Sequence, residues 1–183
     1  GEAICVNRPG YPPVAVHGRT VRGGGVQIPA TASSQYVSSL LLAGPCMENG
    51  VTIEILGDLV SRPYVDLTIQ IMDQFGVPVS RDAYRRFQVA PGREYRPCRL
   101  AVEGDVSSAS YFWAAAAVTG GRVTTTNIHA LTTSQGDIGL LAILEEMGCT
   151  VERTGHAVTV AGGPLKGIEV DMSGMPDMVP TLA

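Results

Sequence analysis

The chain has 183 residues, of which 45% are hydrophobic and 16% charged, and its formal net charge is −4. This composition excludes a disordered segment, because disorder requires fewer apolar residues and more charge. The acidic balance argues against a nucleic-acid surface, so we expect no nucleic-acid partner. No apolar run reaches membrane-spanning length, so we expect no membrane partner.

The cysteines and histidines lie too far apart to form a metal-binding motif. Four cysteines stand without a Cys-x-x-Cys pair, at Cys5, Cys46, Cys98 and Cys149. The three histidines are equally scattered, and no P-loop or dinucleotide fingerprint is present. We therefore expect no metal and no cofactor. Free thiols are typical of a reducing compartment, which predicts a cytoplasmic protein.

One passage occurs twice in the chain, at residues 26–92 and again at residues 100–163. The period is about 73 residues, which is long enough for a whole supersecondary unit. The matching positions are Ser33-Ser34 with Ser107-Ser108, Ser61 with Ser134, and Phe75-Gly76-Val77 with Met147-Gly148-Cys149. The opening residues 1–18 resemble the tail of each copy and residues 168–183 resemble its head, so we expect the chain to be a piece of a longer protein.

Both copies predict the same order of elements, β-α-β-α-β-β, and hence an α/β fold. In the first copy the predicted elements are a strand at 25–28, a helix at 36–43, a strand at 51–56, a helix from Ser61 to Gly76, and strands at 77–80 and 87–90. In the second copy the corresponding strands are 100–102, 122–128, 149–152 and 157–161, with the first helix at 111–118. Between the copies lies the proline-rich segment Pro91–Cys98, a candidate linker.

Ser33, Ser34 and Gln35 stand where the first strand turns into a helix. The unpaired N–H groups of a helix start carry partial positive charge, so hydroxyl and amide side chains there favour an anion site. A plain N-cap cluster is the alternative. The second copy has Ala109 in place of the glutamine, which indicates a role for Gln35 beyond the fold.

Three further side chains stand at predicted helix starts. Ser61 either caps the second helix or binds a phosphate oxygen, and Tyr64 either packs or presents its hydroxyl to a ligand. Asp137 replaces Tyr64 in the second copy. Asp177 follows Met175-Pro176 in the partial third unit, where a carboxylate either caps a helix or acts as a general base.

Four motifs, in this order, resemble the 5-enolpyruvylshikimate-3-phosphate synthase family of enolpyruvyl transferases. They are S-S-Q-Y (Ser33–Tyr36), G-D-L-V-S-R-P-Y-V-D (Gly57–Asp66), E-G-D-V-S-S-A-S-Y-F (Glu103–Phe112) and M-P-D-M (Met175–Met178). The resemblance implies two domains of three units each. Residues 1–92 would be the C-terminal part of one domain (partial unit 1–18, full unit 25–92), residues 93–98 the interdomain crossover, and residues 99–183 part of the other domain (full unit 100–163, partial unit 167–183).

The resemblance also implies an activity of the aromatic amino acid pathway, in which the enolpyruvyl group of phosphoenolpyruvate passes to the 5-hydroxyl of shikimate 3-phosphate. Ser33, Ser34 and Ser61 would hold the shikimate phosphate or ring hydroxyls, and Gln35 would reach both substrates. Tyr64 would contact the phosphate side. Asp177 would bind ring hydroxyls and accept the proton of the 5-hydroxyl. The family uses no metal.

The family's cationic residues have no counterpart between Gly1 and Ala183, so we expect this chain alone to be inactive. Two alternatives stay open: a non-catalytic anion-binding repeat module, and the related transferase that acts on UDP-N-acetylglucosamine. We also expect self-association, because apolar side chains such as Leu40, Leu41, Val179 and Leu182 would lack partners.

Overall fold

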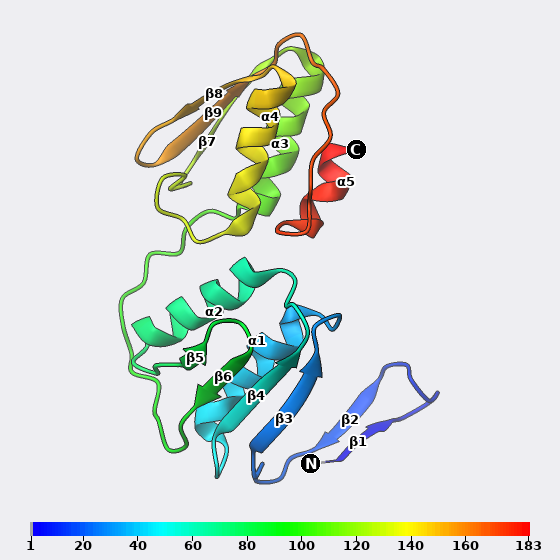
Figure 1. Cartoon of the computed structure of the whole chain (residues 1–183), viewed down its shortest axis with the longest axis vertical. Helices are drawn as coiled ribbons and strands as arrows, with labels where there is room; N and C mark the ends of the chain where they lie inside the picture. Colours follow the sequence, from blue (N-terminus) through cyan, green and yellow to red (C-terminus); the bar gives the residue numbers. More distant parts are fainter. Residues whose placement is uncertain (1) are drawn as a thin grey trace. The chain divides into compact units, whose positions relative to one another are not determined.

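The computed structural model describes residues 2–183 (Figure 1). It divides into two compact units. The first unit runs up to Leu59 and resumes at Thr68–Pro97, and the second comprises Val60–Leu67 and Cys98–Ala183. Three separate sheets form among the described residues, and none of them runs through both sequence copies. That these units are parts of larger three-unit domains stays a prediction.

The first unit opens with an antiparallel hairpin of β1 (Glu2–Cys5) and β2 (Val14–His17), which stands clear of the main sheet (Figure 1). The main sheet has the order β3-β4-β6-β5. Its strands are β3 (Gly24–Pro29), β4 (Val51–Leu56), β5 (Ser80–Asp82) and β6 (Arg86–Val89). β3 runs parallel to β4, while β6 pairs antiparallel with both β4 and β5. A parallel pair needs a crossover, which α1 (Ser34–Ala43) and the short η1 (Gly44–Cys46) supply.

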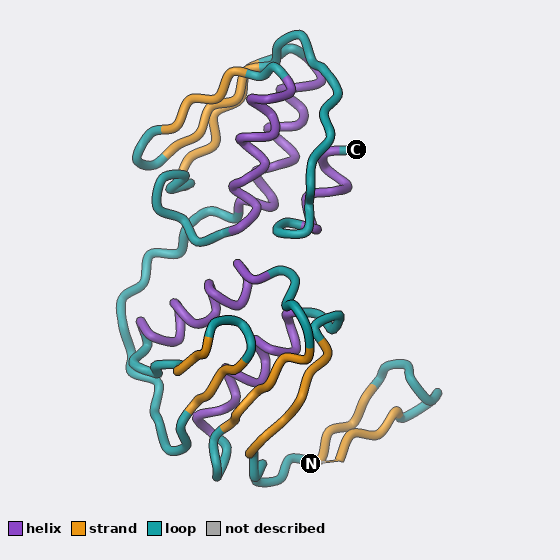
Figure 2. The backbone as a smooth tube through the Cα atoms, in the orientation of Figure 1, coloured by secondary structure: helices purple, strands orange, loops and turns teal. Residues whose placement is uncertain are grey.

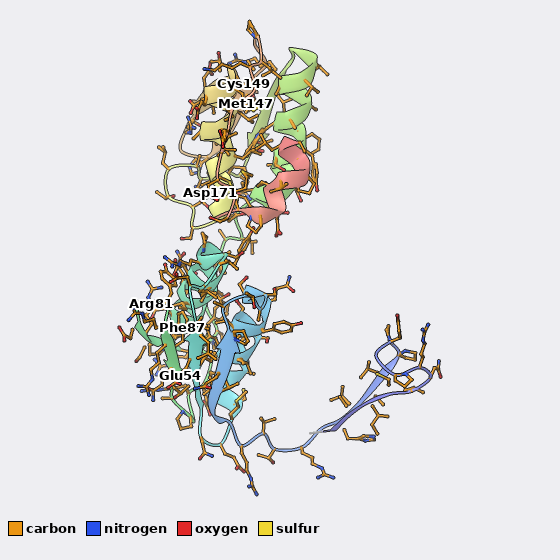
Figure 3. The ribbon with its side chains drawn as sticks, turned by 45° about the vertical axis from the view of Figure 1, so that its right-hand side comes forward. Glu54, Arg81, Phe87, Met147, Cys149 and Asp171 are labelled. Carbon is orange, nitrogen blue, oxygen red and sulfur yellow. The ribbon has the colours of Figure 1, made fainter. Side chains whose placement is uncertain are left out.

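The core of the first unit lies between this sheet and its helical segments: α1, and the part of α2 (Arg62–Gln74) from Thr68 onward. Alternate residues of β4 are buried, at Val51, Ile53 and Ile55, as expected for a strand with one face against a core. Phe87 of β6, labelled in Figure 3, is fully buried. Its ring lies edge-on to that of Tyr84, with 6.5 Å between the ring centroids. The fold of residues 24–89 is therefore the predicted β-α-β-α-β-β unit.

The second unit repeats most of this order, with α3 (Val106–Thr119), β7 (Arg122–Thr126), α4 (Leu140–Met147), β8 (Thr150–Arg153) and β9 (Ala157–Ala161). Its antiparallel sheet has the order β7-β9-β8, and α3 and α4 lie side by side against it (Figure 2). Trp113 of α3 is fully buried and donates its indole N–H to Thr125 Oγ1 at 3.0 Å. The chain ends in η3 (Pro176–Met178) and α5 (Val179–Leu182), which packs on α3.

Two predicted strands are wrong in position. Residues 100–102 form no strand; side chains bind the backbone here, since Asn127 donates to the Val102 carbonyl at 3.1 Å and Gln135 to the Gly104 carbonyl at 2.9 Å. The strand predicted at 77–80 begins only at Ser80. Val77 closes the end of α2 instead, where its N–H donates to the Met72 carbonyl at 2.9 Å and Gly76 adopts a φ of 82°.

Burial corrects the expectation for two of the four residues predicted to lack partners. Leu41 is fully buried in the first unit, and Leu182 packs against the core of the second. Val179 is exposed, as expected, and further exposed apolar residues include Tyr111, Phe112 and Val118 of α3.

All four cysteines are free; Cys149 is buried, and Cys46 and Cys98 are exposed.

Candidate anion-binding site

The start of α1 is built from an uncharged cap. Ser33 has the extended backbone of a cap residue (φ −57°, ψ 137°), and its Oγ accepts the Gln35 N–H at 3.3 Å. Ser34 is buried, Gln35 is exposed, and the first turn contains no acidic residue. The positive end of this helix is therefore not neutralised by an acid of its own first turn, and two hydroxyls and an amide stand at it.

The start of α3 differs, although the sequence copies match there. Its cap is Asp105, whose carboxylate accepts the N–H groups of Ser107 (3.1 Å) and Ser108 (3.2 Å). The hydroxyl of Ser108 lowers the pKa of Asp105 most; burial opposes this, and the two N–H groups add to the lowering. Ser107 and Ser108 thus lie inside the helix instead of capping it. This helix start already holds an anion, the Asp105 carboxylate.

Ala109, the counterpart of Gln35, is a core residue of the second unit. Packing therefore explains the alanine of the second copy, because a glutamine in place of Ala109 would bury an amide among apolar side chains. Gln35 itself is exposed at the helix start, where packing does not dictate its identity.

Ser61 precedes α2 with a φ of 55°, in the left-handed region that non-glycine residues rarely adopt. Its carbonyl accepts the Tyr64 N–H at 3.2 Å. An N-cap normally has an extended backbone, so this conformation does not fit the predicted cap. Unusual backbone conformations of this kind concentrate at binding sites.

Tyr64 meets two carboxylates within the second unit. Its hydroxyl lies 2.8 Å from Asp137 Oδ1 and 3.3 Å from Asp177 Oδ2. The other oxygen of Asp137 accepts the Ser107 hydroxyl, and Asp137 is only 2% exposed. Burial raises the pKa of the Tyr64 phenol, and the neighbouring Asp137 and Asp177 raise it further. Tyr64 therefore stays protonated across the neutral range.

Asp177 lies in the first turn of η3, where it is exposed. The residue at the cap position is Met175, and no side chain caps this turn. The Asp177 carboxylate is therefore accessible to a ligand from solvent, which fits a binding role better than a capping role.

The predicted site residues are distributed over both units. Ser33, Ser34 and Gln35 belong to the first unit, whereas Ser61, Tyr64 and Asp177 belong to the second. Within the second unit the structure brings Tyr64 and Asp177 together. Sequence reasoning missed the contacts of Asp105, Ser107 and Asp137. One signal was present: Tyr64 and Asp137 are equivalent positions of the two copies, 73 residues apart.

The segment before α3 is fixed by a polar network. Glu103 accepts the His129 N–H and the Thr133 hydroxyl, each at 2.8 Å. Gln135 accepts the Val106 N–H at 2.8 Å and donates to the Gly104 carbonyl at 2.9 Å. This network positions the start of α3, and with it Ser107, against the turn that carries Asp137.

Among residues 2–183, no cluster of three or more histidine, cysteine, aspartate or glutamate side chains has a geometry suited to a metal ion. Across the same residues, every helix is too short or too polar to cross a membrane.

Comparison with solved structures defines the class of fold. Two structures of EPSP synthase from Acinetobacter baumannii superpose on 99% of this chain and on 41% and 42% of their own chains, with TM-scores of 0.66 and 0.64 and 25% identity. The repeated unit is thus that of the enolpyruvyl transferase fold. The sequence profile of EPSP synthase (3-phosphoshikimate 1-carboxyvinyltransferase) matches residues 1–183, and the chain belongs to this family.

Curated relatives carry the same family name. The 3-phosphoshikimate 1-carboxyvinyltransferase of Methanoculleus marisnigri is 48% identical over 184 residues, and that of Pasteurella multocida is 43% identical over 183 residues. Both alignments cover 100% of this chain, but only 43% and 41% of the relatives. The chain therefore spans about two fifths of the length of these relatives.

Proposed function

We propose that this chain carries part of the substrate site of a 3-phosphoshikimate 1-carboxyvinyltransferase. The observation that carries the proposal is the family match over residues 1–183. In the proposed reaction the 5-hydroxyl oxygen of shikimate 3-phosphate loses its proton and adds to C2 of phosphoenolpyruvate while C3 gains a proton, which gives a tetrahedral intermediate. Loss of a C3 proton and of the phosphate group from C2 then gives 5-enolpyruvylshikimate 3-phosphate and phosphate. The two substrates are the proposed small-molecule partners.

Ser33, Ser34 and Gln35 are the proposed anion-binding residues of the first unit. Their support is the uncharged start of α1, where the helix dipole and free N–H groups favour a phosphate. Ser33 and Ser34 would hold the phosphate or ring hydroxyls of shikimate 3-phosphate, and Gln35 would reach both substrates.

Ser61, Tyr64 and Asp177 are the proposed residues of the second unit. Ser61 would bind the shikimate phosphate or a ring hydroxyl, and Tyr64 the phosphate side of the same substrate. Asp177 would bind ring hydroxyls and accept the proton of the 5-hydroxyl, for which an exposed carboxylate beside an uncharged phenol is suited.

The proposal includes a cytoplasmic location, which the four free cysteines support, because thiols stay reduced there. It includes no nucleic-acid or membrane partner. It also includes self-association of this chain, which the exposed apolar residues of α3 support.

Calorimetric titration with shikimate 3-phosphate tests the proposed function. We expect saturable binding to the chain, about five- to tenfold weaker in Gln35→Ala, because one hydrogen bond to an anionic ligand is lost. Gln74→Ala, an exposed glutamine at the end of α2, is the matched control and should bind like the unchanged chain. Binding of UDP-N-acetylglucosamine in place of shikimate 3-phosphate would contradict the proposed substrate. Equal effects of the two substitutions would remove Gln35 from the site.

A further inference from the structure

The buried carboxylate of Asp137 is not among the predicted substrate-binding residues, yet it makes the shorter of the two carboxylate contacts of Tyr64. The distance from the Tyr64 hydroxyl is 2.8 Å to Asp137 Oδ1 and 3.3 Å to Asp177 Oδ2. A phenol has one proton to donate, so the two carboxylates compete for it. The shorter contact to a buried acceptor prevails, because a hydrogen bond to a desolvated charge is the stronger one.

Neighbouring groups hold the Asp137 carboxylate in position to accept the Tyr64 hydroxyl. It is 2% exposed, and its Oδ2 accepts the Ser107 hydroxyl from the first turn of α3. A buried carboxylate without donors would be costly, so Tyr64 and Ser107 each offset part of its desolvation. The neighbouring Gly136 leaves room for Pro63, since an added Cβ would stand 2.7 Å from the proline Cβ. The start of α2 can therefore approach the turn closely enough for Tyr64 to reach Asp137.

We infer that Asp137 is a positioning residue: it accepts the hydrogen bond donated by the Tyr64 hydroxyl, so that the phenol oxygen offers only lone pairs to a ligand and Asp177 is left as a proton acceptor. The inference rests on the proposed function for the identity of the ligand, shikimate 3-phosphate. It replaces the phosphate contact proposed for Tyr64 above: Tyr64 accepts a hydrogen bond from a ring hydroxyl while its own O–H donates to Asp137. A phosphate dianion has no proton to give, so it would bind Tyr64 only by displacing Asp137.

The first test reads Tyr64 directly, without any substrate. The chain is labelled with 13C at Cζ of its six tyrosines, and the Tyr64 signal is assigned by its loss in Tyr64→Phe. Asp137→Asn should lower the ionisation midpoint of Tyr64 by about one pH unit or more, because a repelling charge and its hydrogen bond are removed. Glu146→Gln, which removes an exposed charge of the same unit, is the matched control and should leave the midpoint in place.

An unchanged Tyr64 midpoint in folded Asp137→Asn, with the near-ultraviolet signal of Trp113 intact, would overturn the inference. If Asp137→Asn does not fold, a measurement on Asp177→Asn identifies which carboxylate accepts the Tyr64 hydroxyl. In an equal mixture of H2O and D2O, a phenol held in a strong hydrogen bond exchanges slowly and gives two Cζ signals. Two signals that persist in Asp177→Asn identify Asp137 as the acceptor of the Tyr64 O–H, and a single averaged signal contradicts this.

The second test separates positioning from a purely structural role. Asp137→Asn should weaken shikimate 3-phosphate binding about five- to tenfold in the unchanged chain, but less than about twofold in a Tyr64→Phe background. An equal loss in both backgrounds would contradict a role through Tyr64. If the unchanged chain binds no shikimate 3-phosphate, the proposed function fails, and the Tyr64 measurements alone decide the role of Asp137.

Discussion

At the scale of single residues, Ser33 and Asp105 stand at corresponding helix starts but carry different charges. Ser33 caps α1 with a hydroxyl, whereas Asp105 caps α3 with a carboxylate. Both side chains accept free N–H groups of their helix, but only the uncharged Ser33 leaves the positive helix end without a negative charge, so that an external anion is favoured there. Under the proposed function, we therefore expect the charge of the cap residue to decide whether this helix start binds phosphate.

Ser33→Asp tests this difference by giving α1 the cap of α3. The free energy of unfolding should stay equal or rise by up to about 1 kcal/mol, because aspartate is a good cap and favours the dipole. Binding of shikimate 3-phosphate should fall at least about tenfold, because the new carboxylate occupies and repels the anion position. Stability is measured by urea denaturation and affinity by calorimetry.

Ser39→Asp is the control for Ser33→Asp, since it adds the same charge to an exposed position within the same helix. Screening over about two turns of helix should limit its effect on affinity to about twofold. Undiminished binding by Ser33→Asp would remove the start of α1 from the site.

The sequence allowed some of these residue roles to be predicted. Ser33 follows a strand and precedes an apolar helix, so its position at a helix start was readable from the pattern. The left-handed backbone of Ser61 was not, because it depends on how the chain enters α2. The contact of Tyr64 with Asp137 joins residues 73 positions apart and depends on tertiary packing, which the spacing of a repeat does not specify.

At the scale of elements, the segment before α3 is held by Glu103 instead of a β-ladder. Burial opposes ionisation of Glu103, but the hydrogen bonds from Thr133, the His129 N–H and Gln135 outweigh it, and the pKa of Glu103 is lowered. A lowered pKa in the folded state means that the carboxylate contributes stability above its ordinary pKa of about 4.3. This contribution is lost as the pH falls through the folded-state value.

Glu103→Gln should therefore lower the free energy of unfolding of the second unit at pH 7, and the deficit should shrink below about pH 4. Urea denaturation followed by Trp113 fluorescence measures it, because the only tryptophan of the chain lies in this core. Glu146→Gln serves as the comparison. A deficit that is constant from pH 7 to pH 3 would show that charge on Glu103 contributes nothing.

The same segment explains where element prediction failed. Residues 24–29 and 100–102 have similar apolar patterns, but only the first pairs with a neighbour, β4. The choice depends on side chains such as Gln135 that lie more than thirty positions away. Strands with a strong alternation, such as β4 and β9, were predicted with their observed bounds, because one face of each is buried.

At the scale of the whole chain, α3 exposes an apolar stripe. Tyr111, Ala115 and Val118 lie at helical spacing on one face, and Tyr111 and Val118 are 66% and 76% exposed. The opposite face of α3 is buried in the core of the second unit. A helix that is apolar all round normally packs on both sides, so this stripe favours association.

The double substitution Tyr111→Ser with Val118→Ser should therefore shift the chain toward monomer. Light scattering across a concentration series measures the association, and circular dichroism checks that α3 still forms. Leu131→Ser, an exposed loop residue of the same unit, should leave the association unchanged. A monodisperse monomer in the unchanged chain would refute the predicted self-association.

The most direct test of the proposed substrate site is a map of backbone amide shifts during titration with shikimate 3-phosphate. We expect saturable shifts at Ser33–Gln35 of the first unit and at Ser61, Tyr64 and Asp177 of the second. Amides at the start of α3, where Asp105 supplies the anion, should shift little. Saturable shifts confined to the start of α3, or no shifts at up to millimolar ligand, would contradict the assignment of this chain to a shikimate 3-phosphate site.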